Sequence, residues 1–434
     1  MTNRYDIVII GAGPAGLAAA HAAAHADPLL SIAVVDDNPA TGGQIWRGGA
    51  QHQQDERARL LWRELHGAQN VTFIHQARVL YAPEPAALLV QTPSKSMTLH
   101  YQRLILATGA RELLLPFPGW TLPGVTGAGG LQALVKGGYP LDGKRVVVAG
   151  SGPLLLAVAA TLVDKGAQVQ AIVEQADNAS LGRFGLALLA TPSKIMQAWQ
   201  LRSRLQGIPY LRDSHVAAAV SNTSGSAVRA AVVRTAGRDI EIPCDYLACG
   251  YGLVPNPELA LALGCATSAD SGSIDADAWQ QTSRDGIYVA GEGTGVGGVD
   301  KALVEGRIAG LSAAGKRDQA ASHFAERARW RAFAARLARA FAVKPAILAL
   351  AGDDTIVCRC EDVTHGELRS HGTWRSAKLH TRCGMGPCQG RVCGGATGAL
   401  YGWRPDTVRV PLSPARIDSI IFETPHPCSA RSTL

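Results

Sequence analysis

Two stretches of the chain share one order of apolar and polar positions. In each, a short apolar run enters a glycine-rich turn, continues into a longer apolar segment and ends in a second short apolar run. The three segments span 6–10, 17–26 and 31–35 in the first stretch, and 145–149, 154–164 and 169–173 in the second. Short runs rich in Val and Ile on either side of a segment of helical length are typical of a βαβ unit. The pattern therefore predicts an α/β fold with two Rossmann-like dinucleotide-binding domains.

The remaining pattern divides the chain into further units. Strand-like segments occupy 104–107, 227–233 and 240–243, and the chain returns to a strand, a turn and a helix over 280–310. An Ala- and Arg-rich segment with helical spacing follows, and a cysteine-rich segment comes after it. We expect a first α/β domain over 1–112 and 280–315, a second over 113–279, a helical linker over 316–352, a small cysteine-rich domain over 353–396 and a tail over 397–434.

Two apolar stretches are long enough to suggest a signal core or a membrane span. They cover 7–24 and 146–163, and each is interrupted early by Gly-x-Gly-Pro after a β-branched run. A strand, a turn and a helix in succession explain this pattern better than a span does. We therefore expect a cytoplasmic protein, with contact to the inner membrane at most peripheral.

The composition excludes several classes of protein. Among the 434 residues, 47% are apolar and 18% are charged, which is an ordinary globular balance and excludes wholesale disorder. The net charge of +7 comes without a Lys/Arg run interleaved with aromatic residues. Nucleic acid is therefore not an expected partner.

The first glycine turn carries a complete dinucleotide fingerprint. Gly11 permits the tight turn, Gly13 lets the backbone approach a pyrophosphate, and Gly16 allows close packing of helix on strand. The phosphates would lie at the helix N-terminus, and an acidic residue at the end of the second strand would bind the ribose hydroxyls. The residues expected to bind are Gly11, Gly13, Pro14, Ala15, Gly16 and Asp36.

Later segments favour FAD as the dinucleotide. The chain resembles the two-dinucleotide-domain flavoproteins, which include thioredoxin and glutathione reductases, over about residues 1–315. In that group a late strand ends in Gly-Asp, whose carboxylate holds the FAD ribityl chain; here Glu292 replaces the Asp, and the turn over 293–298 would direct helix N–H groups at the pyrophosphate or the flavin. The positions that match the group are Gly43, Gln44, Thr108, Gly109, Gly291 and Glu292.

The second glycine turn is incomplete. Gly150 and Gly152 are present, but Leu155 stands where the third glycine is expected. Glu174 occupies the ribose position, where a carboxylate disfavours a 2′-phosphate. Three interpretations stay open: a site for NAD, a site for another nucleotide such as ATP, and an empty structural relic.

The cysteine positions argue against dithiol chemistry at the flavin. The segment GQIWRG that starts at Gly43 contains no cysteine, and the second domain contains only Cys244, Cys249 and Cys265, without a Cys-x-x-Cys pair. Disulfide reductases of this architecture need two neighbouring thiols, so this activity is not expected. We expect these three cysteines, like Cys428 in the tail, to take no part in the chemistry.

The other five of the nine cysteines fall between 358 and 393. Four thiolates in two local pairs can enclose an iron–sulfur cluster, and they also satisfy zinc. A Cys-x-Cys pair is less typical of zinc ribbons, which favour Cys-x2-Cys. The cluster of cysteines in a chain of this length predicts a metal site rather than a disulfide framework.

This segment resembles the [2Fe–2S] domain of the bacterioferritin-associated-ferredoxin type. The phrases VCRCEDVT and GMGPCQGRVCG are similar to those in the α subunits of opine oxidases, D-hydroxyproline dehydrogenases and hydrogen cyanide synthase, and the flavoprotein part agrees with the same group. The family spacing implies Cys358, Cys360, Cys388 and Cys393 as ligands, with Cys383 as a bystander. The alternative set has Cys383 in place of Cys393.

The resemblance implies the redox subunit of a dye-linked dehydrogenase that acts on CH–NH or CH–NH2 donors. A flavoprotein β subunit would bind the amino acid or opine and oxidise its C–N bond, and a small ferredoxin-like γ subunit is a further expected partner. FAD and the [2Fe–2S] cluster would carry the electrons to an external acceptor, with an FMN at the interface between the subunits. A flavin takes up two electrons and can release them singly, which suits a one-electron cluster.

No catalytic residue can be named in this chain. His52, His75, His100 and His215 are scattered along it and form no acid–base constellation for amine oxidation. Opine, D-hydroxyproline and glycine all remain candidate substrates. Two other hypotheses stay open: a self-contained NAD(P)H-dependent flavin and iron–sulfur reductase, and a non-enzymatic metal-binding scaffold.

Overall fold

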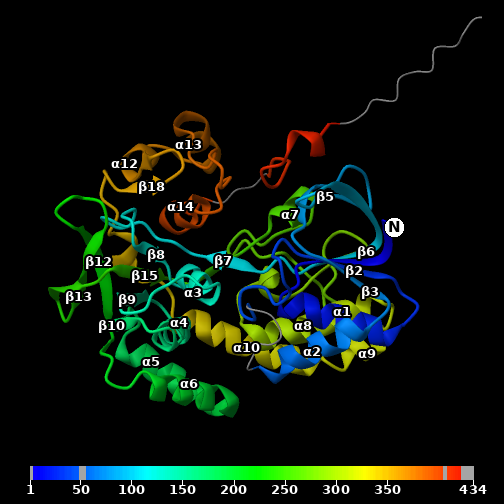
Figure 1. Ribbon diagram of the computed structural model, residues 1–434, viewed down its shortest axis with the longest axis horizontal. Coiled ribbons are helices and arrows are strands. Elements are labelled where there is room, and N and C mark those ends of the chain that lie inside the picture. Colours follow the sequence, from blue (N-terminus) through cyan, green and yellow to red (C-terminus); the bar gives the residue numbers. More distant parts are fainter. Residues whose placement is uncertain (1–2, 48–54, 404–407, 422–434) are drawn as a thin grey trace, which may run out of the picture.

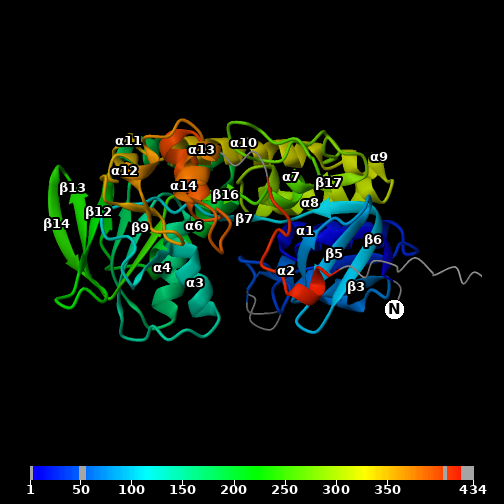
Figure 2. The same cartoon turned by 90° about the horizontal axis from the view of Figure 1, so that it is seen from above.

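Two α/β lobes lie side by side, with a small third domain above the lobe that carries β8, β9 and α3 (Figure 1). The computed structural model describes residues 3–47, 55–403 and 408–421. The view from above shows the same arrangement, with the long helix α10 (Phe324–Ala340) extending from one lobe towards the other (Figure 2). Cys428 and His52 lie outside the described residues.

The first lobe is built on a sheet with strand order β3-β2-β1-β6-β5-β4, in which β17 also pairs with β6. Parallel pairing joins β3, β2, β1, β6 and β17, whereas β4 and β5 form an antiparallel extension. Helices α1, α2 and α8 pack over one face of the parallel part. The bounds are β1 Arg4–Ile10, α1 Pro14–Ala26, β2 Ile32–Val35, α2 Glu56–Gly67, β3 Val71–Ile74, β4 Arg78–Tyr81, β5 Ala87–Gln91, β6 Ser96–Leu106, β17 Ile287–Val289 and α8 Val299–Ala313.

The second lobe repeats the parallel design with the strand order β11-β10-β9-β15-β8. A three-stranded antiparallel sheet, β12-β13-β14, packs beside it. The bounds are β8 Val125–Gly127, α3 Ala128–Lys136, β9 Arg145–Gly150, α4 Leu154–Asp164, β10 Gln168–Glu174, α5 Asn178–Ala187, α6 Pro192–Arg204, β11 Tyr210–Leu211, β12 Ser214–Ser221, β13 Val228–Thr235, β14 Arg238–Pro243 and β15 Tyr246–Gly250. The apolar runs of the two predicted βαβ units are thus β1, α1 and β2 in one lobe and β9, α4 and β10 in the other.

Two short antiparallel strands, β7 (Ala110–Glu112) and β16 (Leu253–Pro255), connect the lobes. After β16 the chain is already back in the first lobe, because Leu259, Cys265 and Ile274 share a core with Val8 of β1. The expected boundary at 279/280 is therefore too late. The segment that follows β16, with α7 (Glu258–Ala262) and few strand-like residues, has no periodic pattern that assigns it to either domain.

The C-terminal part consists of short elements joined to both lobes. Helices α9, α10 and α11 occupy the expected linker, and the cysteine-rich domain follows. Helix α14 runs across the expected boundary at 396/397, and Trp403 after it still packs on the core of the cysteine-rich domain. Farther on, Leu412 packs into the first lobe. The remaining bounds are α9 Arg317–Ala321, α11 Pro345–Leu348, β18 Ile356–Cys358, β19 Val363–Thr364, α12 His365–Leu368, α13 Trp374–Thr381 and α14 Cys393–Tyr401.

The two apolar stretches that could have been membrane spans are interrupted in the structure as expected. Each consists of a buried strand, a glycine turn and a short helix. Within the described parts of the chain, no helix has both the length and the apolar character needed to cross a membrane.

Candidate functional site

The first glycine turn joins β1 to α1, and packing explains two of its glycines. Gly11 has φ +106°, and a Cβ on it would lie 2.2 Å from the carbonyl oxygen of Ala107. A Cβ on Gly16 would lie 1.8 Å from the carbonyl oxygen of Gly11. Any side chain at either position would force the helix away from the strand.

The third glycine of this turn leaves the start of α1 open. A Cβ on Gly13 would have Gly43 Cα at 3.9 Å as its nearest neighbour. Gly13 is the N-cap of α1, Pro14 occupies the first turn, and no side chain caps the helix. Because the first N–H groups of a helix, here next to Ala15, attract anions, this end of α1 can accept a pyrophosphate.

Asp36 locks the turn to the end of β2. Its side chain is buried, and Oδ2 accepts a hydrogen bond of 2.5 Å from the backbone N–H of Ala12. Oδ1 accepts from the backbone N–H and the side-chain amide of Asn38, at 2.8 and 2.7 Å. Since a carboxylate offers about four lone-pair positions, one remains for a ribose hydroxyl. Gln44, in contrast, is exposed and accepts from Arg47.

The end of β6 is held against the strands that connect the lobes. Thr108 Oγ1 donates to the carbonyl oxygen of Asn256 at 2.8 Å, and Asn256 Nδ2 donates to the carbonyl oxygen of Thr108 at 2.9 Å. Gly109 has φ +67°, and nothing lies within 4 Å of where its Cβ would be. This open backbone leaves space for a flat ligand, and the flavin contact there stays a prediction.

Glu292 makes contacts that differ from the expectation. Its two carboxylate oxygens accept from the backbone N–H groups of Gly297 and Gly298, each at 2.9 Å, at the start of α8. These are the N–H groups that we expected to point at the pyrophosphate or the flavin. Burial raises the pKa of Glu292, and the N–H donors partly oppose that rise. In this structure Glu292 thus binds the two residues that directly precede α8, Gly297 and Gly298.

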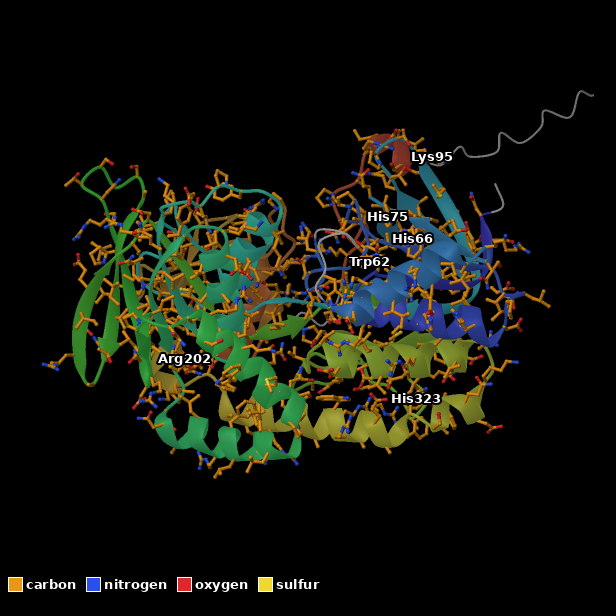
Figure 3. The ribbon with its side chains drawn as sticks, turned by 60° about the horizontal axis from the view of Figure 1, so that its bottom comes forward. Trp62, His66, His75, Lys95, Arg202 and His323 are labelled. Atoms are coloured by element: carbon orange, nitrogen blue, oxygen red, sulfur yellow. The ribbon has the colours of Figure 1, made fainter. Side chains whose placement is uncertain are left out.

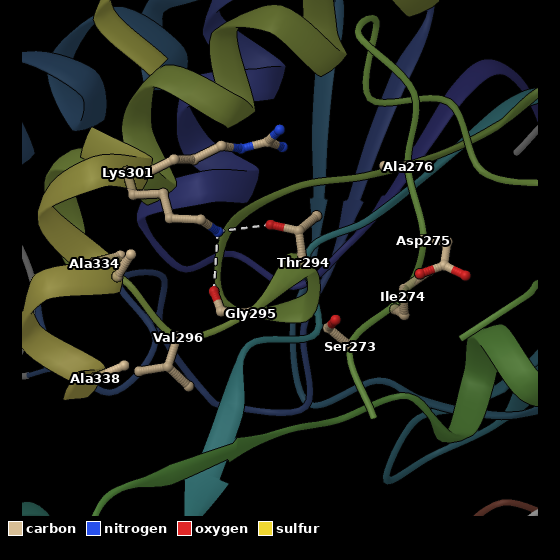
Figure 4. A pocket seen from close by; sticks show the side chains of 12 residues that line it. Ser273, Ile274, Asp275, Ala276, Thr294, Gly295, Val296, Lys301, Ala334 and Ala338 are labelled. Carbon is tan, nitrogen blue, oxygen red and sulfur yellow. Dashed lines mark hydrogen bonds between the residues drawn. The ribbon is translucent and has the colours of Figure 1, made fainter. Parts of the chain in front are cut away.

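A buried ionic network lies below this turn and was not predicted. Lys301 Nζ donates to Glu305 Oε2 at 2.9 Å and to Thr294 Oγ1 at 2.6 Å, while Arg331 Nε of α10 donates to Glu305 Oε1 at 3.0 Å. Figure 4 shows Lys301 facing Thr294 and Gly295 beside a cavity of about 420 Å³. The i, i+4 spacing of Lys301 and Glu305 was visible in the sequence, but not that both side chains are buried.

The second glycine turn is held by its own acidic residue. Glu174 is fully buried, and its carboxylate accepts from the backbone N–H groups of Gly152 at 2.8 Å and Ala176 at 2.9 Å. Burial raises the pKa of Glu174 against the effect of these donors. A Cβ on Gly150 would lie 1.9 Å from the carbonyl oxygen of Gly250 on the neighbouring strand. The turn therefore has the packing of a dinucleotide fold.

The cysteine-rich domain brings its five thiols together. The sulfurs of Cys358, Cys383 and Cys393 lie within 4.8 Å of one another. Cys388 contacts both Cys393 and Cys360 through its sulfur. Cys383 is fully buried within this group, so the structure does not separate it from the other four as a bystander. The structure also gives no support to a ligand set without Cys393, because Cys393 contacts three of the other thiols.

Backbone N–H groups and neighbouring thiols stabilise two of these cysteines as thiolates. Contacts with the Cys383 and Cys393 thiols and with the N–H groups of Gly384 and Glu361 lower the pKa of Cys358 to about 2. The pKa of Cys388 falls to about 5, mainly through the Cys393 thiol. Thiolates that receive N–H donors are the ligands that iron–sulfur clusters and zinc require. The donor set therefore fits either metal.

The cysteine loop is anchored to the strands that connect the lobes. Arg111 of β7 donates through Nε to the carbonyl oxygen of Arg391, at 2.9 Å, within the loop that carries Cys388 and Cys393. Its NH1 donates to Asn256 Oδ1 at 2.7 Å, the residue that also binds Thr108. One guanidinium thus joins the end of β6 to the cysteine loop.

The other described cysteines are buried apart from this group. Cys244, Cys249 and Cys265 are free and almost without exposure, and burial raises the pKa of each thiol. This agrees with the expectation that they are inert. The labelled histidines are also spread over the molecule: His66 and His75 lie on the first lobe and His323 on the helical linker (Figure 3).

Two cavities are lined, over the described residues, by side chains other than histidine and cysteine. The cavity beside Lys301 is also lined by Asp275 and Arg331. A larger hollow of about 820 Å³ lies between Arg47 of the first lobe and the segment from Thr126 to Pro140 of the second. Among the residues that the structure describes, which exclude 48–54 next to Arg47, neither lining includes a histidine or a cysteine.

Comparisons with known proteins agree with these features. A family model described as pyridine nucleotide-disulphide oxidoreductase matches residues 5–315. The chain is 33% identical to an opine oxidase subunit of Rhizobium meliloti over 96% of its own length and 98% of that protein. It is 32% identical to hydrogen cyanide synthase subunit HcnB of Pseudomonas aeruginosa over 89% of its length and 90% of that protein. The fold is shared with the crystal structure of L-proline dehydrogenase from P. horikoshii, with a TM-score of 0.69, 19% identity, and coverage of 96% of this chain and 80% of that one.

Proposed function

Because the chain belongs to the pyridine nucleotide-disulphide oxidoreductase family, with subunits of opine oxidase and hydrogen cyanide synthase among its relatives, we propose that it is the electron-carrying subunit of a dehydrogenase that oxidises the C–N bond of an amino acid or opine. Both relatives are named as subunits, which supports a partner chain. The proposed partner is a flavoprotein β subunit that binds the substrate, with a small ferredoxin-like γ subunit as a further partner.

The first lobe would hold FAD. The open start of α1 at Gly13 would receive the pyrophosphate, and the free acceptor position of Asp36 would receive a ribose hydroxyl. The backbone at Thr108 and Gly109 would face the flavin. When bound, the flavin supplies two-electron chemistry with release of single electrons. The chain's own residues would position the cofactor.

The cysteine-rich domain would hold a [2Fe–2S] cluster. The resemblance to the bacterioferritin-associated-ferredoxin type supports Cys358, Cys360, Cys388 and Cys393 as the ligands, with Cys383 as the alternative to Cys393. The thiolates at Cys358 and Cys388 and their N–H donors support the same assignment. Zinc would satisfy the thiols equally well, so metal content decides between the two.

The observation that carries the proposal is the link through Arg111. The guanidinium contacts Asn256, which holds the end of β6, and the cysteine loop at Arg391. The expected flavin position and the thiols are therefore connected by a few hydrogen-bonded residues. Such a connection supports transfer of electrons between the two groups.

The test is co-expression of the chain with the chains encoded beside its gene, followed by cofactor extraction and a substrate screen with a dye acceptor. We expect FAD and two irons per chain, and flavin bleaching by an opine, a D-hydroxyproline or glycine only when the partner is present. Full-rate amine oxidation by the isolated chain would contradict the division of labour. A purified protein without flavin and iron absorbance would support a non-enzymatic scaffold instead.

A variant of Arg111 tests the electron route. Arg111→Leu removes the contacts to Asn256 and Arg391, and Arg103→Leu at an exposed position of β6 is the matched control. In stopped-flow experiments on the complex, we expect R111L to slow reoxidation of the flavin by about tenfold or more, with bleaching by the substrate unchanged. Equal reoxidation rates in R111L and R103L would contradict a route through Arg111.

A further inference from the structure

The end of α10 and the residues after it lie on the second glycine turn. A Cβ on Gly152 would have the ring of Phe341 at 3.5 Å and Phe341 Cβ at 3.8 Å as its nearest neighbours. Phe341 is the C-cap of α10 and is far from Gly152 in the sequence. The glycine whose open face lets a backbone approach a pyrophosphate is thus covered by an aromatic ring of the chain itself.

Hydrogen bonds hold this segment in place from both sides of the turn. Ser151 Oγ, within the turn, donates to the carbonyl oxygen of Phe341 at 2.9 Å. Gln175, which follows β10, donates through Nε2 to the carbonyl oxygen of Ala342 at 2.8 Å and accepts through Oε1 from the backbone N–H of Lys344 at 2.9 Å. The segment Phe341–Lys344 therefore bridges the ends of β9 and β10.

Burial makes these bonds more than a surface contact. Gln175 is 1% exposed and Ser151 is 7% exposed. Gln175 Nε2 also donates to Ser151 Oγ at 2.9 Å, and the segment supplies the other acceptors and the N–H donor of this buried group. Phe341 also packs edge-on against Phe184 of α5, with ring centroids 5.2 Å apart. Removing the segment would take away the acceptor of the Ser151 hydroxyl and the donor to Gln175 Oε1, which favours the bound arrangement of the segment.

The position of the segment is the one that a nucleotide needs. In open α/β sheets, ligands bind in the crevice beyond the carboxyl ends of the strands, between the glycine turn and the acidic residue of the next strand. Here these are Gly150–Gly152 after β9 and Glu174 at the end of β10. The side chains that border this crevice, Ser151 and Gln175, are bound to the backbone of Phe341–Lys344.

We propose that residues 341–344 are a built-in occupant of the second dinucleotide fold, so that this fold takes neither NAD(P)H nor ATP. The segment continues into α11, whose Ile347 is buried in the core of the second lobe, and from there into the cysteine-rich domain. The second dinucleotide fold thus holds the linker in place. If the proposed function holds, electrons then enter this chain from the partner subunit and not from a nicotinamide bound to this chain.

The first experiment measures binding of NADH, NADPH and ATP to the holoprotein by titration calorimetry. We compare the wild type with Gln175→Ala/Phe341→Ala, which removes the ring and the main tether, and with Phe333→Ala, an aromatic truncation on the same helix away from the turn. We expect no saturable binding of any of the three ligands to the wild type or to F333A. The double variant should bind NADH saturably, at least about tenfold more tightly than the weakest binding that the titration of the wild type would detect. Micromolar binding of any of the three ligands to the wild type would overturn the proposal, and so would a double variant that binds NADH no better than F333A.

A second measurement does not depend on the variant's folding. Hydrogen exchange of the wild-type backbone should show slow exchange at the Lys344 amide, with no change on addition of millimolar NADH or ATP. Altered exchange at 150–152 and 341–344 on addition of a nucleotide would overturn the proposal. Failure of the proposed function has a different signature. The flavin would then not be bleached by substrate in the presence of the partner, whether or not NADH binds.

Discussion

At the residue scale, each of the two dinucleotide folds uses its acidic residue in the same way. Asp36 and Glu174 both turn back to accept from a backbone N–H of the preceding glycine turn. The difference lies in what covers the turn: Gly13 is close to Gly43 of its own lobe, whereas Gly152 is covered by Phe341 from the linker. Similar local motifs therefore have different surroundings because of side chains that are distant in the sequence.

The raised pKa of Glu174 predicts a loss of folding stability that depends on pH. Because the folded-state pKa exceeds the unfolded value of about 4.3, the folded protein holds more protons between the two pKa values, and stability falls as the pH rises through that window. Glu174→Gln removes this loss. We expect the urea midpoint of E174Q to gain on that of the wild type as the pH rises from about 4.3. Glu56→Gln, at the exposed start of α2, controls for the loss of one charge; an E174Q difference that is constant with pH would contradict the prediction.

The cysteine ligands give a second prediction at this scale. We expect Cys393→Ser to lose the cluster, because Cys393 contacts three of the other thiols and belongs to the Cys-x4-Cys spacing. Cys383→Ser should keep it. Iron and acid-labile sulfide per chain are the measurement, with zinc determined in parallel. A C383S protein without iron, next to a C393S protein that retains it, would assign the alternative ligand set.

At the element scale, α8 is more than the helix that closes the first fold. Glu292 accepts from the backbone N–H of Gly298, the N-cap residue of α8, and the buried face of α8 carries Lys301 and Glu305, of which Glu305 contacts Arg331 on α10. Helix α10 therefore contacts α8 through Arg331, and at its other end it leads into the segment on the second glycine turn. The Ala/Arg-rich composition of α10 thus serves packing between elements.

The buried pair on α8 predicts a large and non-additive effect on stability. Glu305→Leu leaves Lys301 buried without its carboxylate partner, and we expect a loss of about 3–5 kcal/mol in the free energy of unfolding. Lys301→Met together with Glu305→Leu removes both charges, so the double variant should be more stable than E305L. Denaturant unfolding of the four proteins of the cycle measures both values. If the double variant lost as much free energy of unfolding as the two single variants together, the two side chains would not be coupled.

At the scale of the whole molecule, Asp300 joins three elements from both lobes. Its carboxylate binds Arg57 NH1 of α2 at 2.7 Å and Lys194 Nζ of α6 at 2.6 Å. Lys194 and Asp300 are largely buried. The relative position of the lobes, and with it that of the glycine turns, therefore depends in part on one side chain.

Asp300→Asn tests this joint. The variant weakens two charge-assisted hydrogen bonds, and we expect a loss of about 2 kcal/mol in the free energy of unfolding. We also expect faster proteolysis between the lobes while flavin content is retained. Asp318→Asn on α9 is a surface control. Unchanged proteolysis of D300N would show that other contacts, such as the β7–β16 pair, hold the lobes by themselves.

Much of this architecture could be predicted because the relevant signals are local. Both βαβ units, the roles of Gly11 and Gly16 and the grouping of the five cysteines follow from short-range patterns, and comparison with known proteins confirms the resemblance to opine oxidase and hydrogen cyanide synthase subunits. The domain boundary near 256, the buried Lys301–Glu305 pair and the turn of Glu292 onto α8 could not be predicted. Each depends on burial or on a contact between segments that no periodicity records.

The sequence by itself determined the fold class, the candidate flavin turn and the candidate metal ligands, because glycine spacing, β-branched runs and thiol spacing each place their chemistry within a few residues. It left three interpretations open for the second glycine turn. The tertiary structure alone brings Phe341 onto Gly152 and Arg111 onto the cysteine loop. Both contacts join residues that are distant along the chain, and their energy comes from burial and hydrogen bonding that exist only after the lobes and the linker have packed together.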